Sequence, residues 1–252
     1  MDVTDTAAIV TGGASGLGAA VARELAKRGS LVFALDLEQA VRAAAPVDGV
    51  TLVAADVTDG AAVSAAVEQA AGSGVPLRVV VNCAGIGPSA RTVGKSGPHD
   101  LDLFRKVVEV NLIGTFTVLS IAAAAIAKTE PDANGQRGVA VNTASIAAFD
   151  GQIGQVAYAA SKGGVVGLTL PAARDLASLG IRVCTIAPGI VDTPMLATVS
   201  DEYRAGLAAG VPFPKRLARP EEFAALVGTV VEHDYLNGET IRMDGALRMA
   251  PR

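Results

Sequence analysis

Short apolar runs alternate with longer amphipathic stretches along almost the whole chain. The apolar runs predict strands at residues 7–11, 31–36, 51–57, 77–82, 138–145, 182–187 and 239–244. The run Val79–Val81 is continuously apolar, which is typical of a strand covered on both faces. The stretches between the runs predict helices at residues 15–28, 60–71, 100–128, 156–179, 199–209 and 220–232. This alternation predicts an α/β fold, a doubly wound parallel sheet in a single domain over residues 1–252.

Two irregular segments interrupt the pattern, at residues 86–98 and 188–214, and the first is rich in Gly, Pro and Ser. Ligands of a doubly wound sheet bind outside the carboxyl ends of its strands, so we expect both segments to flank the functional site. Pro171 falls inside the helical stretch 156–179. Because proline lacks an N–H donor and clashes with the preceding turn, we expect it to kink or loosen that helix.

The composition indicates one large aliphatic core. Hydrophobic residues make up 50% of the chain and aromatic residues 4%, and tryptophan is absent. Such a chain needs neither disulfides nor metals to fold. Cys83 and Cys184 lie in apolar runs without C-x-x-C spacing, so we expect buried free thiols and no metal site. A net charge of −4 without a Lys/Arg run argues against nucleic acid as the main partner.

The N-terminal residues and the hydropathy pattern bear on location. Residues 1–8 contain two Asp and no basic residue, so they do not resemble a secretory signal. No uninterrupted apolar run reaches the length that spans a membrane. We therefore expect a soluble, cytoplasmic protein without a membrane partner.

A glycine-rich turn, TGGASGLG at residues 11–18, joins the first strand to the first helix. Gly12, Gly16 and Gly18 allow a tight turn and close approach of a ligand to the backbone. The helix N-terminus offers free N–H groups and the positive end of the helix dipole to a pyrophosphate. Because the turn follows the first strand and an acid ends the next strand, the pattern predicts a dinucleotide-binding site.

That acid is Asp36. A carboxylate at this place accepts hydrogen bonds from the adenosine ribose hydroxyls and repels a 2′-phosphate. The next residues, Leu37 and Glu38, supply no positive charge for such a phosphate. The sequence therefore favours NAD over NADP as the cofactor.

Tyr158 and Lys162 are spaced to share one face of a helix, and Ser145 ends the preceding strand. Oxidation of an alcohol needs a base for the O–H proton while hydride leaves the carbon. A free tyrosine, with a pKa of about 10, is a poor base at neutral pH, but a nearby ammonium lowers its pKa. Ser145 would hold the reacting oxygen. This set predicts a nicotinamide-dependent dehydrogenase with Tyr158 as general base.

Taken in order along the chain, these residues resemble the motifs of the short-chain dehydrogenase/reductase family, whose fold is Rossmann-like. The matching positions are residues 11–18, Asp56, Val57, residues 82–85, Asn111, Ser145, Tyr158, Lys162, Pro188, Gly189 and Thr193. The resemblance implies cofactor contacts from Gly12, Ser15, Gly16, Leu17, Gly18, Asp36, Asp56, Val57, Cys83, Ala84, Gly85, Tyr158, Lys162, Pro188, Gly189, Val191 and Thr193.

The resemblance also implies where some of these contacts fall. Asp56 and Val57 would lie against the adenine, and Val191 and Thr193 against the nicotinamide. Asn111 would complete a catalytic tetrad by bending a helix and holding a water that relays protons through Lys162.

Within the family, residues 142–155, 169–177, 211–214 and 236–249 resemble the type 2 branch of 3-hydroxyacyl-CoA dehydrogenases, which also accept hydroxysteroids. Pro171 belongs to the shared pattern. The resemblance implies NAD-dependent oxidation of an acyl-CoA substrate in fatty acid metabolism by a homotetramer. Gln152 would bind the substrate together with Ser145 and Tyr158. Residues 190–192 and Met195 depart from the branch pattern, which leaves the acyl specificity open.

Other functions remain open alongside this one. A hydroxysteroid dehydrogenase fits the same motifs, as does a 3-oxoacyl-carrier-protein reductase, although Asp36 disfavours the NADPH that the latter usually takes. A nucleotide-binding scaffold is possible on the same fold, but an intact tetrad counts against it. The phosphates of an acyl-CoA require a basic residue near the cleft, for which the candidates are Arg91, Lys95, Lys215 and Arg216.

Overall fold

The computed structural model describes residues 1–95, 97–196 and 200–251. Within them, seven strands form one sheet in the order β3-β2-β1-β4-β7-β8-β9, and every neighbouring pair is parallel. The strands are β1 (Ala7–Thr11), β2 (Leu31–Asp36), β3 (Val50–Ala54), β4 (Leu77–Asn82), β7 (Gly138–Thr143), β8 (Ile181–Pro188) and β9 (Thr240–Met243). The prediction of a doubly wound parallel sheet is confirmed. Because the strand order reverses between β1 and β4, a ligand crevice is expected there.

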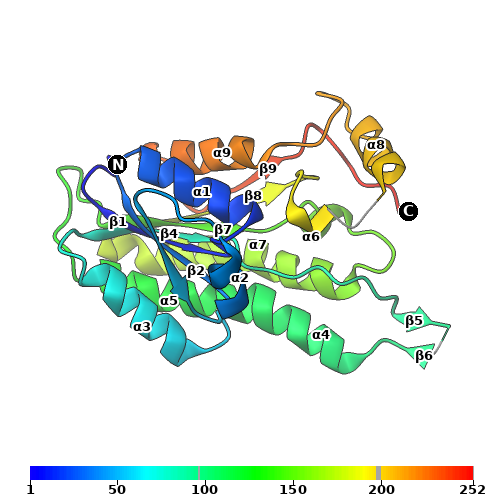
Figure 1. Ribbon diagram of the computed structural model, residues 1–252, viewed down its shortest axis with the longest axis horizontal. Coiled ribbons are helices and arrows are strands. Elements are labelled where there is room, and N and C mark those ends of the chain that lie inside the picture. The colour runs from blue at the N-terminus through cyan, green and yellow to red at the C-terminus, as the bar shows by residue number, and fades with distance from the viewer. Residues whose placement is uncertain (96, 197–199, 252) are drawn as a thin grey trace.

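Helices cover both faces of the sheet (Figure 1). On one face, α1 (Gly16–Lys27) packs beside α9 (Pro220–Glu232). The other face is covered by α3 (Gly60–Ala71), α5 (Gly114–Ile126) and α7 (Val156–Leu176). Alternate residues of β1 belong to two separate apolar clusters, one on each face of the sheet. This two-sided burial explains why the strands are continuously apolar.

One helical stretch runs from Leu101 to Ile126 through α4 (Leu101–Val108), a π-helical turn (Glu109–Ile113) and α5. By length and composition it could cross a membrane, but 44% of its most apolar part is buried inside the protein. Length and composition alone are weak evidence for a membrane span. Because α5 packs against α3 and β4, the stretch contributes a core helix to this domain.

Several small elements gather at the edge where the strands end, on the right in Figure 1. They are the antiparallel hairpin of β5 (Val93–Gly94) and β6 (Gly97–Pro98), α6 (Ala147–Asp150), a 3₁₀ turn (Pro194–Leu196) and α8 (Asp201–Ala209). A further short helix, α2 (Glu38–Ala43), follows β2. The irregular segments 86–98 and 188–214 flank this edge, as predicted.

The structure differs from the sequence-based expectation in a few elements. Neither α2, the β5–β6 hairpin nor α6 was predicted, since each is too short to show a periodic pattern. The predicted helix 100–128 is divided by the π-helical turn, and the predicted start of helix 199–209 lies outside the described residues. The helix α7 continues past Pro171, which lies on an exposed part of the helix.

Candidate active site

The glycine-rich turn at residues 11–18 forms a cradle between β1 and α1. Gly12 and Gly16 have φ angles of +63° and +52°, a region that other residues rarely adopt. A Cβ atom at Gly18 would lie 2.1 Å from the carbonyl oxygen of Gly12, so the turn requires glycine there. The N-cap residue Ser15 makes no side-chain cap, and the first turn of α1 carries no acid. The N–H groups of this turn therefore fit an anionic pyrophosphate.

Asp36 ends β2 beside this cradle. One of its carboxylate oxygens accepts the N–H of Ala14 at 3.1 Å, and the other accepts the N–H of Leu37 at 2.8 Å. The residue is half-buried, and each oxygen keeps a lone pair for a ribose hydroxyl. Arg42, the next basic residue along the chain, pairs with Glu38 on α2. The surroundings of Asp36 thus fit a dinucleotide without a 2′-phosphate.

Thr11 joins the carboxyl ends of β1 and β4. Its hydroxyl accepts the N–H groups of Cys83 and Ala84, each at 3.1 Å. A Cβ atom at Gly12 would lie 3.0 Å from the Ala84 nitrogen, so the two loops meet backbone to backbone. Thr11 was predicted to lie in the turn, but this role was not predicted. The sequence did contain a signal for this role, because Thr11 ends one predicted strand and Cys83 and Ala84 follow the end of another.

Asn111 lies in the π-helical turn and is fully buried. Its carboxamide accepts the N–H of Ile86 at 2.8 Å and donates to the Ile86 carbonyl at 2.9 Å and to the Ser161 hydroxyl at 3.0 Å. Single π-helical turns inside longer helices are frequent at functional sites. The resemblance implies that Asn111 bends a helix, and the structure has a π-helical turn at this residue; the partnership with Ser161 was not predicted.

Lys162 lies in α7 and is buried, with 4% of its surface exposed. Its Nζ atom donates to the carbonyl of Thr143 at 2.7 Å. Burial disfavours the ammonium and lowers the pKa of Lys162 to about 8. A Cβ atom at Gly85 would lie 3.6 Å from this Nζ and 3.1 Å from Oδ1 of Asn111. Gly85 thus leaves open the space in which Lys162 and Asn111 approach each other.

Ser145 follows β7, and its Oγ accepts the N–H of Ala147 at 3.1 Å. Tyr158 lies in the first turn of α7, and the Ser145 side chain is near enough to its phenol to lower the pKa of Tyr158. The Nζ atom of Lys162 lies 5.9 Å from the centre of the Tyr158 ring. The structure therefore brings the three predicted catalytic side chains together beyond the end of β7.

The pKa of Tyr158 does not follow the expectation from sequence. Burial raises this pKa above its ordinary value, and the nearby hydroxyl of Ser145 partly opposes the rise. The Nζ atom of Lys162, which lies 5.9 Å from the centre of the Tyr158 ring, donates to the Thr143 carbonyl. The residue that lowers the Tyr158 pKa here is Ser145.

Comparisons with known proteins agree with this geometry. The profile of the family described as short chain dehydrogenase matches residues 6–204. The chain belongs to the short-chain dehydrogenase family. It is accordingly an oxidoreductase.

Relatives of this short-chain dehydrogenase match it over nearly its full length. The 3-hydroxyacyl-CoA dehydrogenase type-2 of Bos taurus is 50% identical over 249 residues, which cover 97% of this chain and 95% of that protein. The protein of the same name from Drosophila melanogaster is 49% identical and covers 99% and 100%. A crystal structure of 3-hydroxyacyl-CoA dehydrogenase type-2 from Mycobacterium avium shares 45% identity, with a TM-score of 0.94 and 98% of each chain covered.

Other residues expected at the cofactor of this short-chain dehydrogenase follow β3. Asp56 is exposed, and its carboxylate accepts the N–H and the hydroxyl of Thr58 at 2.9 and 2.8 Å. Val57 is buried against Gly114, where a Cβ atom would lie 2.7 Å from the valine. Asp56 therefore orders the loop that follows β3, and Val57 fixes this loop against α5.

The segment after β8 returns toward the glycine-rich turn. Pro188 ends β8, and the N–H of Gly189 donates to a carbonyl of β9 at 2.9 Å. Val191 is buried. The side chain of Thr193 lies 3.7 Å from the position of a Cβ atom at Gly16. The structure thus brings Thr193 over the turn that the sequence assigns to the pyrophosphate.

Gln152, which we expected to face the substrate, contacts the C-terminal part of the chain instead. Its Nε2 donates to the carbonyl of Ala250 at 2.9 Å, and its backbone N–H donates to Oε1 of Gln155 at 3.0 Å. This partner of Gln152 was not predicted. A contact between positions 98 residues apart leaves no local pattern to read.

The basic residues considered for the phosphates of an acyl-CoA have different surroundings. Arg216 forms two hydrogen bonds to the Glu222 carboxylate, at 2.7 and 2.8 Å, which lower the pKa of Glu222 to about 2. Arg91 lines an open pocket of about 390 Å³ together with residues 151–156 and Ala159. Of the two, Arg91 is the better placed, because its pocket adjoins the first turns of the helix that carries Tyr158.

Proposed function

We propose that the protein oxidises a 3-hydroxyacyl-CoA to the 3-oxoacyl-CoA with NAD as the hydride acceptor. The observation that carries the proposal is the convergence of Ser145, Tyr158, Lys162 and Asn111 beyond the ends of β4 and β7, beside a glycine-rich cradle. The substrate class is supported by relatives of about 50% identity that bear the name 3-hydroxyacyl-CoA dehydrogenase.

Tyr158 acts as the general base in this proposal. The phenolate takes the proton of the substrate hydroxyl while hydride leaves the same carbon, and the oxidised nicotinamide supplies the acceptor when it is bound. Ser145 holds the substrate oxygen, and because it lowers the pKa of Tyr158 it also favours the phenolate. Both side chains lie at the edge of the sheet, where the hydroxyl can contact the two groups at once.

Lys162 and Asn111 support the base. With a pKa of about 8, Lys162 is mostly protonated at neutral pH, and its remaining N–H groups can bind ribose hydroxyls. Asn111 fixes the loop at Ile86 and the hydroxyl of Ser161, so the walls around Lys162 stay in place. We infer that the proton taken by Tyr158 leaves through this polar group.

Asp36 selects the cofactor. Its carboxylate lies between the glycine-rich turn and Leu37, where a 2′-phosphate would meet a negative charge. Arg42, the basic residue that follows on α2, is paired with Glu38 and does not bind a 2′-phosphate in this proposal. NAD is therefore favoured over NADP.

The pocket that contains Arg91 is the proposed path of the pantetheine and phosphate part of the substrate. The guanidinium gives it a cation, and Ile153 and Val156 give it apolar lining.

We also propose a cytoplasmic homotetramer. Leu101, Ile113 and Phe116 leave apolar surface exposed on the continuous helix, which supports association of copies, and soluble oligomers usually close with point symmetry.

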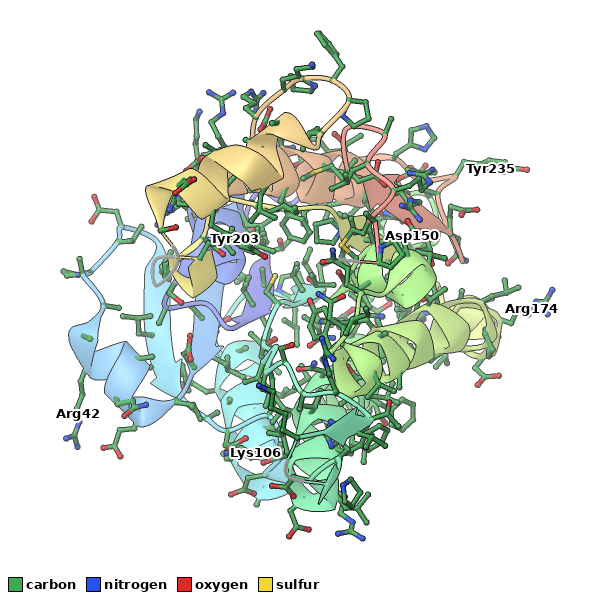
Figure 2. All side chains as sticks on the ribbon, turned by 90° about the vertical axis from the view of Figure 1, so that its right-hand side faces the viewer. Arg42, Lys106, Asp150, Arg174, Tyr203 and Tyr235 are labelled. Atoms are coloured by element: carbon green, nitrogen blue, oxygen red, sulfur yellow. The ribbon has the colours of Figure 1, made fainter. Side chains whose placement is uncertain are left out.

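The decisive experiment measures NADH formation from 3-hydroxybutyryl-CoA by wild-type enzyme and by Tyr158→Phe. Because the variant keeps the ring and loses the base, we expect kcat/KM to fall by roughly 10²–10⁴-fold. Tyr235→Phe is the matched control. Tyr235 is 96% exposed, and Figure 2 shows it on the surface, so its loss should leave the rate unchanged.

Undiminished turnover by Tyr158→Phe would remove Tyr158 as the base. Faster wild-type turnover with NADP than with NAD would contradict the role of Asp36. Faster oxidation of a hydroxysteroid than of any 3-hydroxyacyl-CoA would replace the proposed substrate while leaving the base in place.

A further inference from the structure

A network of charged side chains joins β9 to the end of α6. Arg242 of β9 donates to the carboxylate of Asp150 at 2.6 Å and to that of Asp244 at 2.7 Å. Its guanidinium also lies 5.0 Å from the centre of the Phe149 ring. The Arg242 and Asp150 side chains are only 21% and 22% exposed. Arg242 is therefore a largely shielded cation that holds two parts of the chain 92 residues apart in sequence.

Residues 244–251, which we call the C-terminal segment, begin at this network. Asp244 is 7% exposed in its side chain, and it also binds Arg248 at 3.1 Å and the N–H of Ala246 at 3.0 Å. Ala246 has a φ angle of +66°, which costs a residue with a side chain about 1 kcal/mol. The contacts of Asp244 hold this unfavourable turn, so the direction in which the segment leaves β9 is fixed.

The C-terminal segment then follows the loop between α6 and α7. The carbonyl of Ala250 accepts the side chain of Gln152 at 2.9 Å, and the carbonyl of Pro251 accepts the N–H of Ile153 at 3.0 Å. Figure 2 shows Asp150 at the end of α6, next to the C-terminal segment, which is drawn in red. The segment therefore holds this loop along its length as well as at Arg242.

The C-terminal segment also packs against both ends of the segment that follows β8. Leu247 and Met249 form one apolar cluster with Ile146, Ile190 and Val211. Ile146 comes directly after Ser145, while the other two lie near the beginning and the end of the segment 189–213. One short stretch of chain thus packs against the residue that follows Ser145 and against both ends of this segment.

The role of this network follows from its position next to the proposed catalytic residues. The loop that it holds has Ser145 on one side in sequence and Tyr158 on the other, and the Ser145 side chain is near enough to the phenol to lower the pKa of Tyr158. We propose that Arg242 and Asp150 are positioning residues, which anchor the loop 146–156 to the C-terminal segment and so set the placement of Ser145 and Tyr158 over the substrate hydroxyl.

Asp150→Asn tests the proposal, with 3-hydroxybutyryl-CoA as substrate and NAD as oxidant. Small displacements of positioned groups reduce rates by up to about 10²-fold, so we expect kcat to fall roughly 10- to 100-fold. The affinity for NADH, measured by fluorescence titration, should be unchanged, because the cradle at residues 11–18 is built by β1 and α1 and not by this loop. Asp150→Glu restores the carboxylate and should recover most of kcat, which loss of a merely stabilising contact does not require.

Asp102→Asn is the matched control. Asp102 forms an exposed ion pair with Arg105 at 2.7 Å on α4, so the same change there should leave kcat, KM and NADH affinity as in wild type. If Asp150→Asn does not fold, Arg242→Lys replaces it, since an ammonium keeps the charge but cannot bridge two carboxylates as a guanidinium does. The same fall in kcat is expected from Arg242→Lys.

Wild-type kcat in Asp150→Asn or Arg242→Lys would overturn the proposal, as would an equal loss in Asp150→Asn and Asp150→Glu. The inference rests on the proposed function only for the choice of substrate. If the wild type does not oxidise 3-hydroxybutyryl-CoA, the proposed substrate fails. The comparison of variants then uses whichever secondary alcohol the wild type oxidises, and it tests the positioning role separately.

Discussion

Two buried cations lie at opposite ends of the sheet, and their surroundings differ. Lys162 is 4% exposed and stands where the strands end, among Ser145 and Tyr158. Arg182 is 5% exposed and stands in the first residues of β8, at the other end of the sheet. No carboxylate lies within ion-pair distance of either cation in the part of the chain that is described.

Arg182 meets a nearly complete set of acceptors. Its guanidinium donates to the side chain of Gln136 at 2.8 Å and to the carbonyls of Val230, Val231 and Leu236 at 3.0, 2.8 and 2.8 Å. Val230 and Val231 lie in the last turn of α9, where the negative end of the helix dipole favours a cation. Burial lowers the pKa of Arg182, but a guanidinium stays charged at any ordinary pH. Arg182 therefore binds the free carbonyls in the last turn of α9 and joins this helix to β8.

Lys162 has one hydrogen bond among the described residues, to the carbonyl of Thr143, although an ammonium carries three donors. Burial lowers its pKa from 10.5 to about 8, so keeping it charged at neutral pH costs about 3 kcal/mol. Buried groups that serve structure are satisfied, as Arg182 is, whereas under-satisfied buried charges mark functional sites. The end of the sheet that contains Arg182 is thus built for stability, whereas the end that contains Lys162 is the one proposed for catalysis.

Lys162→Met is the most severe test of this difference. Loss of the ammonium should reduce kcat/KM by roughly 10²–10⁴-fold. Because the buried charge is gone and only one hydrogen bond is lost with it, the free energy of unfolding at pH 7 should rise by about 1–3 kcal/mol. Steady-state rates and urea unfolding at one fixed protein concentration measure both. A variant that loses activity and stability together would show Lys162 to be a structural cation like Arg182.

Arg182→Met should have the opposite effect. It leaves three carbonyls and the Gln136 side chain without their donor in the interior, so the free energy of unfolding should fall by roughly 3–5 kcal/mol. The folded fraction should keep kcat close to wild type, because Arg182 contacts none of the catalytic residues. Arg42→Met is the control, since Arg42 is exposed on α2 and its pair with Glu38 contributes within about 0.5 kcal/mol. Equal unfolding free energies of the two variants would contradict the assignment.

Much of the fold follows from local sequence pattern. The strands and long helices were predicted because burial on both faces of a parallel sheet produces continuous apolar runs between amphipathic stretches. The glycine-rich turn and the Tyr158–Lys162 spacing were readable for the same reason, since each is contained in a few neighbouring residues. The crevice between β1 and β4 then follows from the strand order.

The rest depended on contacts that sequence spacing does not encode. The hydrogen bond of Gln152 to Ala250 joins positions 98 residues apart, and that of Arg242 to Asp150 joins positions 92 residues apart. No local sequence pattern predicts either contact. The pKa of Tyr158 was predicted in the wrong direction for this structure because the degree of burial and the acceptor of Lys162 are three-dimensional facts. The pKa of a side chain in a site can therefore be assigned only when its burial and its neighbours are known.

The smallest effect is a difference in pH dependence between wild type and Lys162→Met. The folded-state pKa of Lys162 lies below its ordinary value, so between pH 8 and 10.5 the unfolded chain binds the proton that the folded chain has released. Stability therefore rises with pH through this window, and the cost of the buried charge is greatest below pH 8. From pH 7 to 9 the wild type should gain about 1 kcal/mol relative to Lys162→Met.

The comparison ends at pH 9 because Cys83 opposes the trend above it. Burial raises the pKa of its thiol to about 11, so the unfolded chain loses that proton first and stability falls as pH rises further. Urea unfolding of both proteins at pH 7, 8 and 9 separates the two groups, since Cys83 is present in each. A constant difference between the proteins across these three pH values would mean that Lys162 keeps its ordinary pKa. The buried ammonium would then carry no cost, and the contrast with Arg182 would disappear.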